Sequence, residues 1–256
     1  MIDRTVLQTG AEIPFPQGRL IIHPPNLYEI GLIGGEAALW GACDVLTANK
    51  NSLVDMDKSV LDNISNFDII MSIMLDKDSK VKEQAVNTVR LLSLLFPSYT
   101  CSLQKQKIIF TKGDQEGYLD ATNIDLFQQI IRQLFVLNKT KGEDYNPVNK
   151  KAAALAAKMQ KARQKVAAQK AATAAQQSII DRYISILAVG ERKNQTDICK
   201  LTVYQLFDEF ERFQLNASYE ANIRARLAGA TELDDPADWM KDLQTKEDSN
   251  TKNVFD

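Results

Sequence analysis

The chain has 256 residues, of which 45% are hydrophobic and 25% charged, and its formal net charge is −2. These proportions are ordinary for a folded, soluble protein and exclude a disordered chain. A single histidine, His23, and three widely separated cysteines exclude two-histidine metal sites and CxxC motifs.

We therefore predict a non-enzymatic protein with no catalytic, metal-ligating or cofactor-binding residues and no cofactor. The longest apolar stretches, Ile69 to Leu75 and Leu91 to Phe96, are shorter than the roughly 18–20 residues that cross a bilayer. The N-terminus has no secretory-signal pattern. We expect no membrane association.

The first elements are predicted from turn residues and β-branched runs. Ile13 to Gly18 has the proline and glycine content of a turn, and residues 19–23 form a β-prone run. Asn26 and Glu29 have capping-box spacing, which predicts a short helix that ends at Gly34-Gly35. A second helix is expected from Glu36.

Apolar residues at steps of three and four predict two helices, over residues 58–75 and 77–96, which form an antiparallel hairpin. Pro97 stops the second helix. Residues 99–103 and 107–111 predict a two-stranded hairpin, followed by a tight turn over Asp114 to Gly117.

A further amphipathic helix is predicted to begin at Thr122, which has Asp125 three residues later. Its apolar face comprises Phe127, Ile130, Ile131, Leu134 and Phe135. It ends before Lys139.

Residues 149–177 contain twelve alanines and seven lysines or arginines, and no acid occurs between Asp144 and Asp181. Alanine, lysine and glutamine favour a helix, which would be about 42 Å long. We interpret it as a solvated spacer, because it has no aromatic residues for base stacking. Eight acids from Gly229 onward predict pairing with it, within one chain or between chains of a homo-oligomer.

The C-terminal part is predicted to be helical. An apolar helix begins at Ile179 and is terminated by Gly190. Thr202 and Gln205 have capping-box spacing, and the helix they open runs on to Gly229. A last short helix starts at Asp235-Pro236 and carries Trp239.

These elements predict a mainly α protein (α+β) with a small β-hairpin. We expect an N-terminal α+β domain over 1–145, a basic Ala/Lys-rich connecting helix over 146–178, a C-terminal helical domain over 179–245 and a flexible tail over 246–256.

Two apolar helix faces are candidates either for the core or for a groove that receives a partner's helix. The candidate partner-binding residues are Phe127, Ile130, Ile131, Leu134, Val203, Leu206, Phe207, Phe210, Phe213 and Trp239.

Residues 201–213, with the sequence LTVYQLFDEFERF, resemble a segment of tail assembly chaperones from phages and prophages of Gram-positive bacteria. Ile13 to Pro16 with Leu20 to Pro25, and Leu227 to Ala230 followed by Asp238 to Lys241, resemble the same proteins in the same order. Together these segments cover about a quarter of the chain and are structural rather than catalytic.

The resemblance implies a non-enzymatic chaperone in the host bacterial cytoplasm. Such a protein binds the long, helical tape measure protein, keeps it soluble during tail morphogenesis and helps to recruit tail tube protein. Two alternatives remain open: a structural component of the mature tail or baseplate, and a nucleic-acid-binding protein that uses Lys150 to Lys170.

Overall fold

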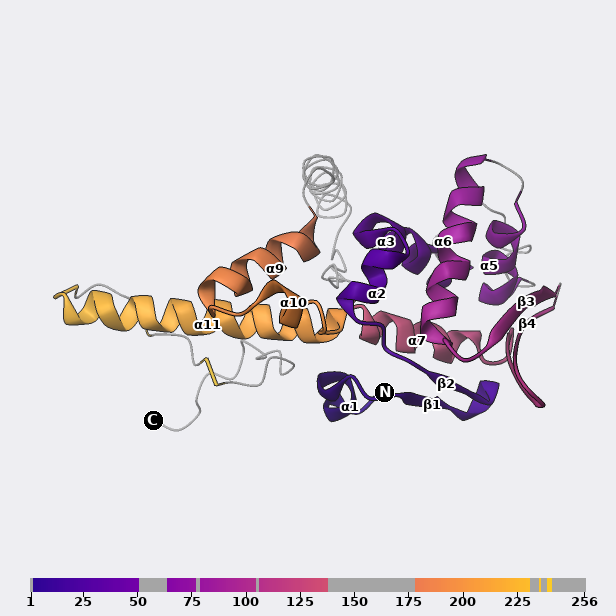
Figure 1. Ribbon diagram of the computed structural model, residues 1–256, viewed down its shortest axis with the longest axis horizontal. Helices are drawn as coiled ribbons and strands as arrows, with labels where there is room; N and C mark the ends of the chain where they lie inside the picture. Colours follow the sequence, from indigo (N-terminus) through magenta and orange to yellow (C-terminus); the bar gives the residue numbers. More distant parts are fainter. Residues whose placement is uncertain are drawn as a thin grey trace, which may run out of the picture. The chain divides into compact units, whose positions relative to one another are not determined.

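The protein, as a computed structural model, is described over residues 2–50, 64–76, 79–104, 106–137, 178–230, 235 and 239–240. It is mainly helical with small antiparallel sheets, which confirms the predicted fold class (Figure 1). The chain divides into two compact units, Met1–Leu206 and Phe207–Asp256. The predicted connecting helix lies outside the described residues except for Ser178, and the predicted domain boundaries stay predictions.

The described helices of the first unit are α1 (Arg4–Thr9), α2 (Leu27–Leu32), α3 (Gly35–Leu46), α5 (Asn66–Met74), α6 (Ser79–Leu95), α7 (Ile124–Leu134), α9 (Ile179–Gly190) and α10 (Gln195–Ile198). Its strands are β1 (Ile13–Phe15), β2 (Leu20–Ile22), β3 (Thr100–Gln104), β4 (Lys107–Lys112) and β5 (Gln115–Asp120). The long helix α11 (Val203–Leu227) begins in the first unit and continues into the second.

The N-terminal segment forms a hairpin where the sequence analysis expected a turn. Ile13 pairs with Ile22 and Phe15 with Leu20, so β1 and β2 are antiparallel. Only η1 (Pro16–Gly18) makes the turn. The four paired side chains are buried and anchor the hairpin in the core.

The short helix α2 begins and ends as predicted. The Glu29 N–H donates to Asn26 Oδ1 over 2.9 Å, and the Asn26 N–H donates to Glu29 Oε2 over 2.8 Å. Both halves of the capping box are present. Gly34 and Gly35 have φ of 120° and 74°, a conformation that favours glycine and ends the helix.

The helix predicted over 58–75 is wrong at its start. Residues 58–63 lie outside the described residues, and Ile64 and Ser65 are not helical. Ser65 has an extended ψ of 161° and forms a capping box with Asp68, so α5 begins at Asn66. Apolar residues recur at helical spacing on both sides of Ser65, which is why the sequence predicted one continuous helix. In the structure Ser65 is the N-cap, so the helical backbone begins only at the next residue. The helix predicted over 77–96 is confirmed as α6, which packs against both α3 and α5.

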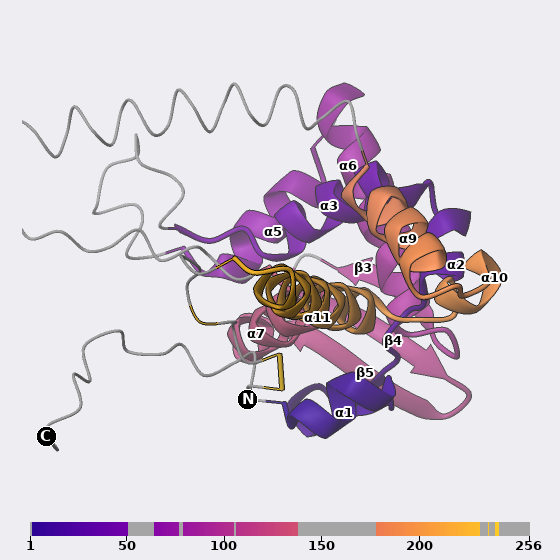
Figure 2. The same ribbon diagram turned by 90° about the vertical axis from the view of Figure 1, so that its left-hand side faces the viewer.

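The predicted two-stranded hairpin is a three-stranded antiparallel sheet of order β3-β4-β5 (Figure 2). Gly113, with φ of 58°, lies in the turn, whereas Gln115 to Gly117 already belong to β5. The tight turn predicted over Asp114 to Gly117 is therefore wrong: the turn comprises Gly113 and Asp114, and the strand begins at the next residue. Leu119 faces the core in β5 beside Ile108 of β4.

The sheet meets the β1–β2 hairpin at two glycines. A Cβ on Gly117 would lie 2.3 Å from Leu20 Cδ2 and 2.8 Å from the Gly18 carbonyl oxygen. A Cβ on Gly18 would lie 2.6 Å from the Tyr118 carbonyl oxygen. The two backbones can approach this closely only because neither residue has a side chain.

An aromatic cluster forms the centre of the first unit. The Phe96 ring lies 4.4 Å from the Phe110 ring and 6.1 Å from the Phe127 ring, measured between centroids. The Phe127 ring is also 6.1 Å from Phe15. These four side chains are at most 1% exposed, and they join β1, β4, α7 and the residue that directly follows α6.

Helix α7 is confirmed, but its predicted cap is wrong. Asn123, not Thr122, is the N-cap, and the Thr122 hydroxyl donates to Asp120 Oδ1 over 2.6 Å. Asp120, the last residue of β5, therefore holds the Thr122 hydroxyl in a turn. The three-residue spacing from Thr122 to Asp125 gave no sign of this hydrogen bond.

The C-terminal helices follow the prediction. Helix α9 spans Ile179–Gly190, and α11 begins with a capping box between Thr202 and Gln205. Gly229 has φ of 95° just beyond the end of α11. The sequence analysis missed the four-residue α10, and the helix predicted at Asp235-Pro236 lies mostly outside the described residues.

Candidate functional site

The apolar face predicted on α7 lies in the core. Phe127 and Ile131 are fully buried, and Leu134 and Ile130 are 3% and 7% exposed. Ile130 also lines a pocket with Phe15 and Gln133, but all four side chains of the face are at least nine-tenths covered, so their placement favours packing over docking. A binding role for these four residues stays a prediction.

The face predicted on α11 is divided between the two units. Val203 and Leu206 are buried in the first unit, and Phe210 is buried as well. Phe207 and Phe213 are half-buried. Trp239 is 37% exposed, and its carbonyl oxygen accepts a 2.8 Å hydrogen bond from Arg212 Nη1. Of the residues predicted to bind a partner, Phe207, Phe213 and Trp239 have the most exposed surface.

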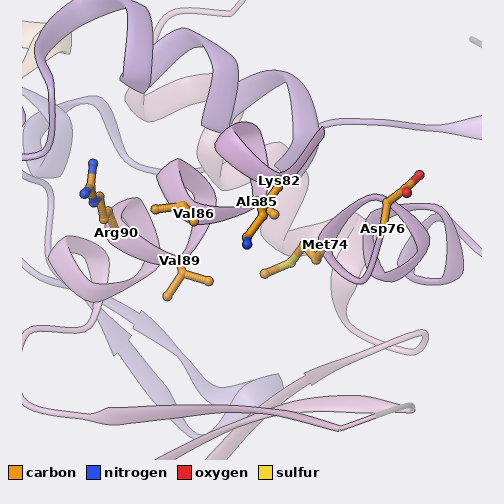
Figure 3. A pocket seen from close by; sticks show the side chains of 7 residues that line it. All are labelled: Met74, Asp76, Lys82, Ala85, Val86, Val89 and Arg90. Atoms are coloured by element: carbon orange, nitrogen blue, oxygen red, sulfur yellow. The ribbon is translucent and has the colours of Figure 1, made fainter. Parts of the chain in front are cut away.

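An open apolar groove of about 460 Å³ lies along α6, where α5 ends beside it (Figure 3). We call it the α6 groove; its lining residues are Met74, Asp76, Lys82, Ala85, Val86, Val89 and Arg90. Met74 and Ala85 are buried and form its floor, whereas Val86 is 42% exposed. An apolar side chain of a partner could enter this groove.

The sequence analysis missed the α6 groove. It interpreted the apolar residues of the two helices over 58–75 and 77–96 only as periodic stripes that pack against each other. The available signal was the pair Ala85-Val86, which widens the apolar stripe of α6 beyond what one packing face needs. An apolar stripe that is too wide leaves one edge exposed.

The N-terminus of α9 is bound by a carboxylate from α3. The backbone N–H groups of Ile179 and Ile180 donate to the Glu36 oxygens over 3.1 and 3.0 Å. The Ser178 hydroxyl also donates to Glu36, and Trp40 Nε1 donates over 2.8 Å. Burial raises the pKa of the Glu36 carboxyl, but these hydrogen bonds outweigh it and hold the pKa below its ordinary value.

The segment before α11 is held by α2. The Leu27 N–H donates to the Leu201 carbonyl over 2.9 Å, and the Tyr28 N–H donates to the Cys199 carbonyl over 3.0 Å. With the Glu36 contacts, these bonds tie α9 and the following segment to the N-terminal elements of the first unit. Their donors are the first N–H groups of α2 and α9, which a helix cannot satisfy itself.

Two of the three cysteines and the single histidine are among the side chains whose chemistry could serve catalysis. Burial, with the nearby Asp44 carboxylate, raises the pKa of the Cys43 thiol, and burial raises the pKa of Cys101 to about 11. Both thiols are therefore protonated and poor nucleophiles near neutral pH. His23 Nε2 lies 3.5 Å from Glu29 Oε2, beside the α2 capping box.

No group of three or more His, Cys, Asp or Glu residues within the described ranges could hold a metal ion. In the same part of the chain, no helix has the length and apolar character to span a membrane.

Residues 173–244 match the family model described as the YomV second domain, a phage-related domain. This range contains α9, α10 and α11, and it covers less than a third of the chain. No curated protein and no solved structure matches the chain.

Proposed function

We propose that this protein is a non-enzymatic phage tail assembly chaperone, which binds the helical tape measure protein and keeps it soluble in the host bacterial cytoplasm. The observation that carries the proposal is the match of residues 173–244 to a phage-related domain. Two of the three segments that resemble tail assembly chaperones, Leu201 to Phe213 and Leu227 to Lys241, lie inside this range.

The surface of the first unit supports a binding role. The α6 groove leaves Val86 uncovered, and Leu75 beside Met74 is 54% exposed. A client helix that places its apolar face there would shield that face from self-association, which is what a chaperone for an aggregation-prone helix must do. The proposed partners are the tape measure protein and, during tail growth, the tail tube protein.

Co-expression with the tape measure protein of the same phage tests the proposal. We expect the client to be soluble and to co-purify with this protein, and to precipitate when it is expressed alone. A client that is equally soluble without this protein contradicts the proposal. A suitable control is the same client expressed with an unrelated helical protein.

The match to a phage-related domain also suits a structural component of the mature tail or baseplate. Mass spectrometry of purified virions separates the two functions. A chaperone is absent from mature particles, whereas a structural component is present in stoichiometric amounts.

A further inference from the structure

The charged residues of the α6 groove are arranged around its apolar part. Lys82 and Arg90 are both on α6, eight residues apart, which corresponds to about 12 Å along the helix axis. Val86 lies midway between them. The groove is therefore an apolar strip with a cation towards each end.

No carboxylate in the described part of the first unit forms an ion pair with either cation. Arg90 Nη1 donates to the Ile33 carbonyl oxygen over 3.4 Å, and among the described residues neither Arg90 nor Lys82 forms an ion pair. In Figure 3 the Asp76 carboxylate points away from Val86 and Val89. The groove thus presents positive charge to an occupant.

We propose that the α6 groove binds an amphipathic helix of a partner protein whose apolar face is flanked by carboxylates about two turns apart, one for Lys82 and one for Arg90. The argument rests on charge complementarity: the apolar strip takes the apolar face, and the cations select acidic flanks and set the position of the helix along the groove. The proposal rests on the proposed function and names the type of client segment that the chaperone recognises.

A polyanion such as nucleic acid fits this site less well. Two cations neutralise few phosphates, and the residues between them, Ala85, Val86 and Val89, have no aromatic ring on which a base could stack.

Two synthetic helical peptides of about 20 residues, long enough to be partly helical alone, test the proposal with the full chain. Both have one leucine face; the first has glutamates flanking it two turns apart, and the second has lysines at the same positions. Binding is measured by fluorescence anisotropy at low and moderate salt. We expect the glutamate peptide to bind at least tenfold more tightly than the lysine peptide, with a preference that shrinks as salt rises.

Variants of the groove locate the binding. The double variant K82E/R90E is expected to weaken binding of the glutamate peptide about tenfold and to strengthen binding of the lysine peptide, because it reverses the charge at both ends of the groove. Val86→Asp is expected to abolish binding of both peptides. The control is Lys200→Glu, which reverses an exposed cation after α10 and leaves binding unchanged. The changed side chains are exposed, so each variant is expected to fold, and circular dichroism checks this.

Any of the following results overturns the proposal. Equal binding of both peptides, or no effect of K82E with R90E, removes the charge complementarity. Self-association of this protein that Val86→Asp abolishes makes the groove a contact between two copies. If neither peptide binds while the tape measure protein still co-purifies, the groove proposal fails and the chaperone function stands.

Discussion

The strongest test of the fold concerns Phe127, because the same residue is a core side chain in one interpretation and a partner-binding side chain in the other. Its ring is fully buried, and its centroid lies 6.1 Å from the rings of both Phe15 and Phe96. Phe127→Ala removes the ring and leaves a cavity among these neighbours. Substitutions of this kind lower the free energy of unfolding by about 3–5 kcal/mol.

For a unit of this size, about 4 kcal/mol corresponds to a fall in Tm of about 8–16 °C. The first unit can be followed by urea unfolding with the fluorescence of Trp40, which lies in α3, in a Trp239→Phe background that removes the second tryptophan. Phe127→Leu keeps most of the volume and loses the ring contacts, so we expect it to cost about 1.5 kcal/mol. This milder variant gives a measurable value if Phe127→Ala does not fold.

The matched control is Val86→Ala, another apolar residue on a helix, whose side chain is 42% exposed. It is expected to change the free energy of unfolding by less than about 1 kcal/mol. A loss below about 1 kcal/mol for Phe127→Ala would refute the packing argument and return the α7 face to the candidates for partner binding.

Three further predictions follow from single contacts. Gly117→Ala forces the new Cβ against Leu20 and is expected to lower the free energy of unfolding by about 2 kcal/mol. The control is Gly31→Ala, whose Cβ meets nothing within 4 Å and which is expected not to destabilise the protein. Urea unfolding measures both variants. Because the pKa of Glu36 is lowered in the folded chain, its hold on α9 is complete above the ordinary pKa of 4.5 and weakens as pH falls below it. Protection of the Ile179 N–H from hydrogen exchange, corrected for the intrinsic rate, should therefore fall in acid, and Glu36→Gln should remove this pH dependence; protection that does not vary with pH contradicts it. Thr202→Ala removes the side-chain cap of α11 and is expected to cost about 1 kcal/mol, and a thermal melt equal to that of the unchanged chain would show that the cap contributes nothing.

The sequence predicted the features that depend on neighbours along the chain. The capping boxes at Asn26 and Thr202 and the helix end at Gly190 form as expected, because each is made by residues within about one helical turn. The errors at Ser65 and Thr122 also concern caps. In both places two local signals competed, and the hydrogen bond formed in the folded chain decided between them.

Strand β5 shows a different limit of prediction from sequence. Gln115 to Gly117 has the composition of a turn, and it becomes a strand because β4 lies on one side of it and Gly18 approaches it from the hairpin. No residue near Gly117 in the sequence indicates that approach. A close approach between backbone segments about a hundred residues apart is a property of the folded chain.

The amino-acid sequence by itself determined the helical periodicity, several helix ends, the scarcity of histidine and cysteine and the resemblance to phage tail assembly chaperones. Only the tertiary structure decided which apolar faces are covered. Phe127 and Val86 both lie on amphipathic helices, yet one is enclosed by Phe15 and Phe96 and the other borders an open groove. The physical reason is that burial depends on what packs against a side chain, and those partners come from distant parts of the chain.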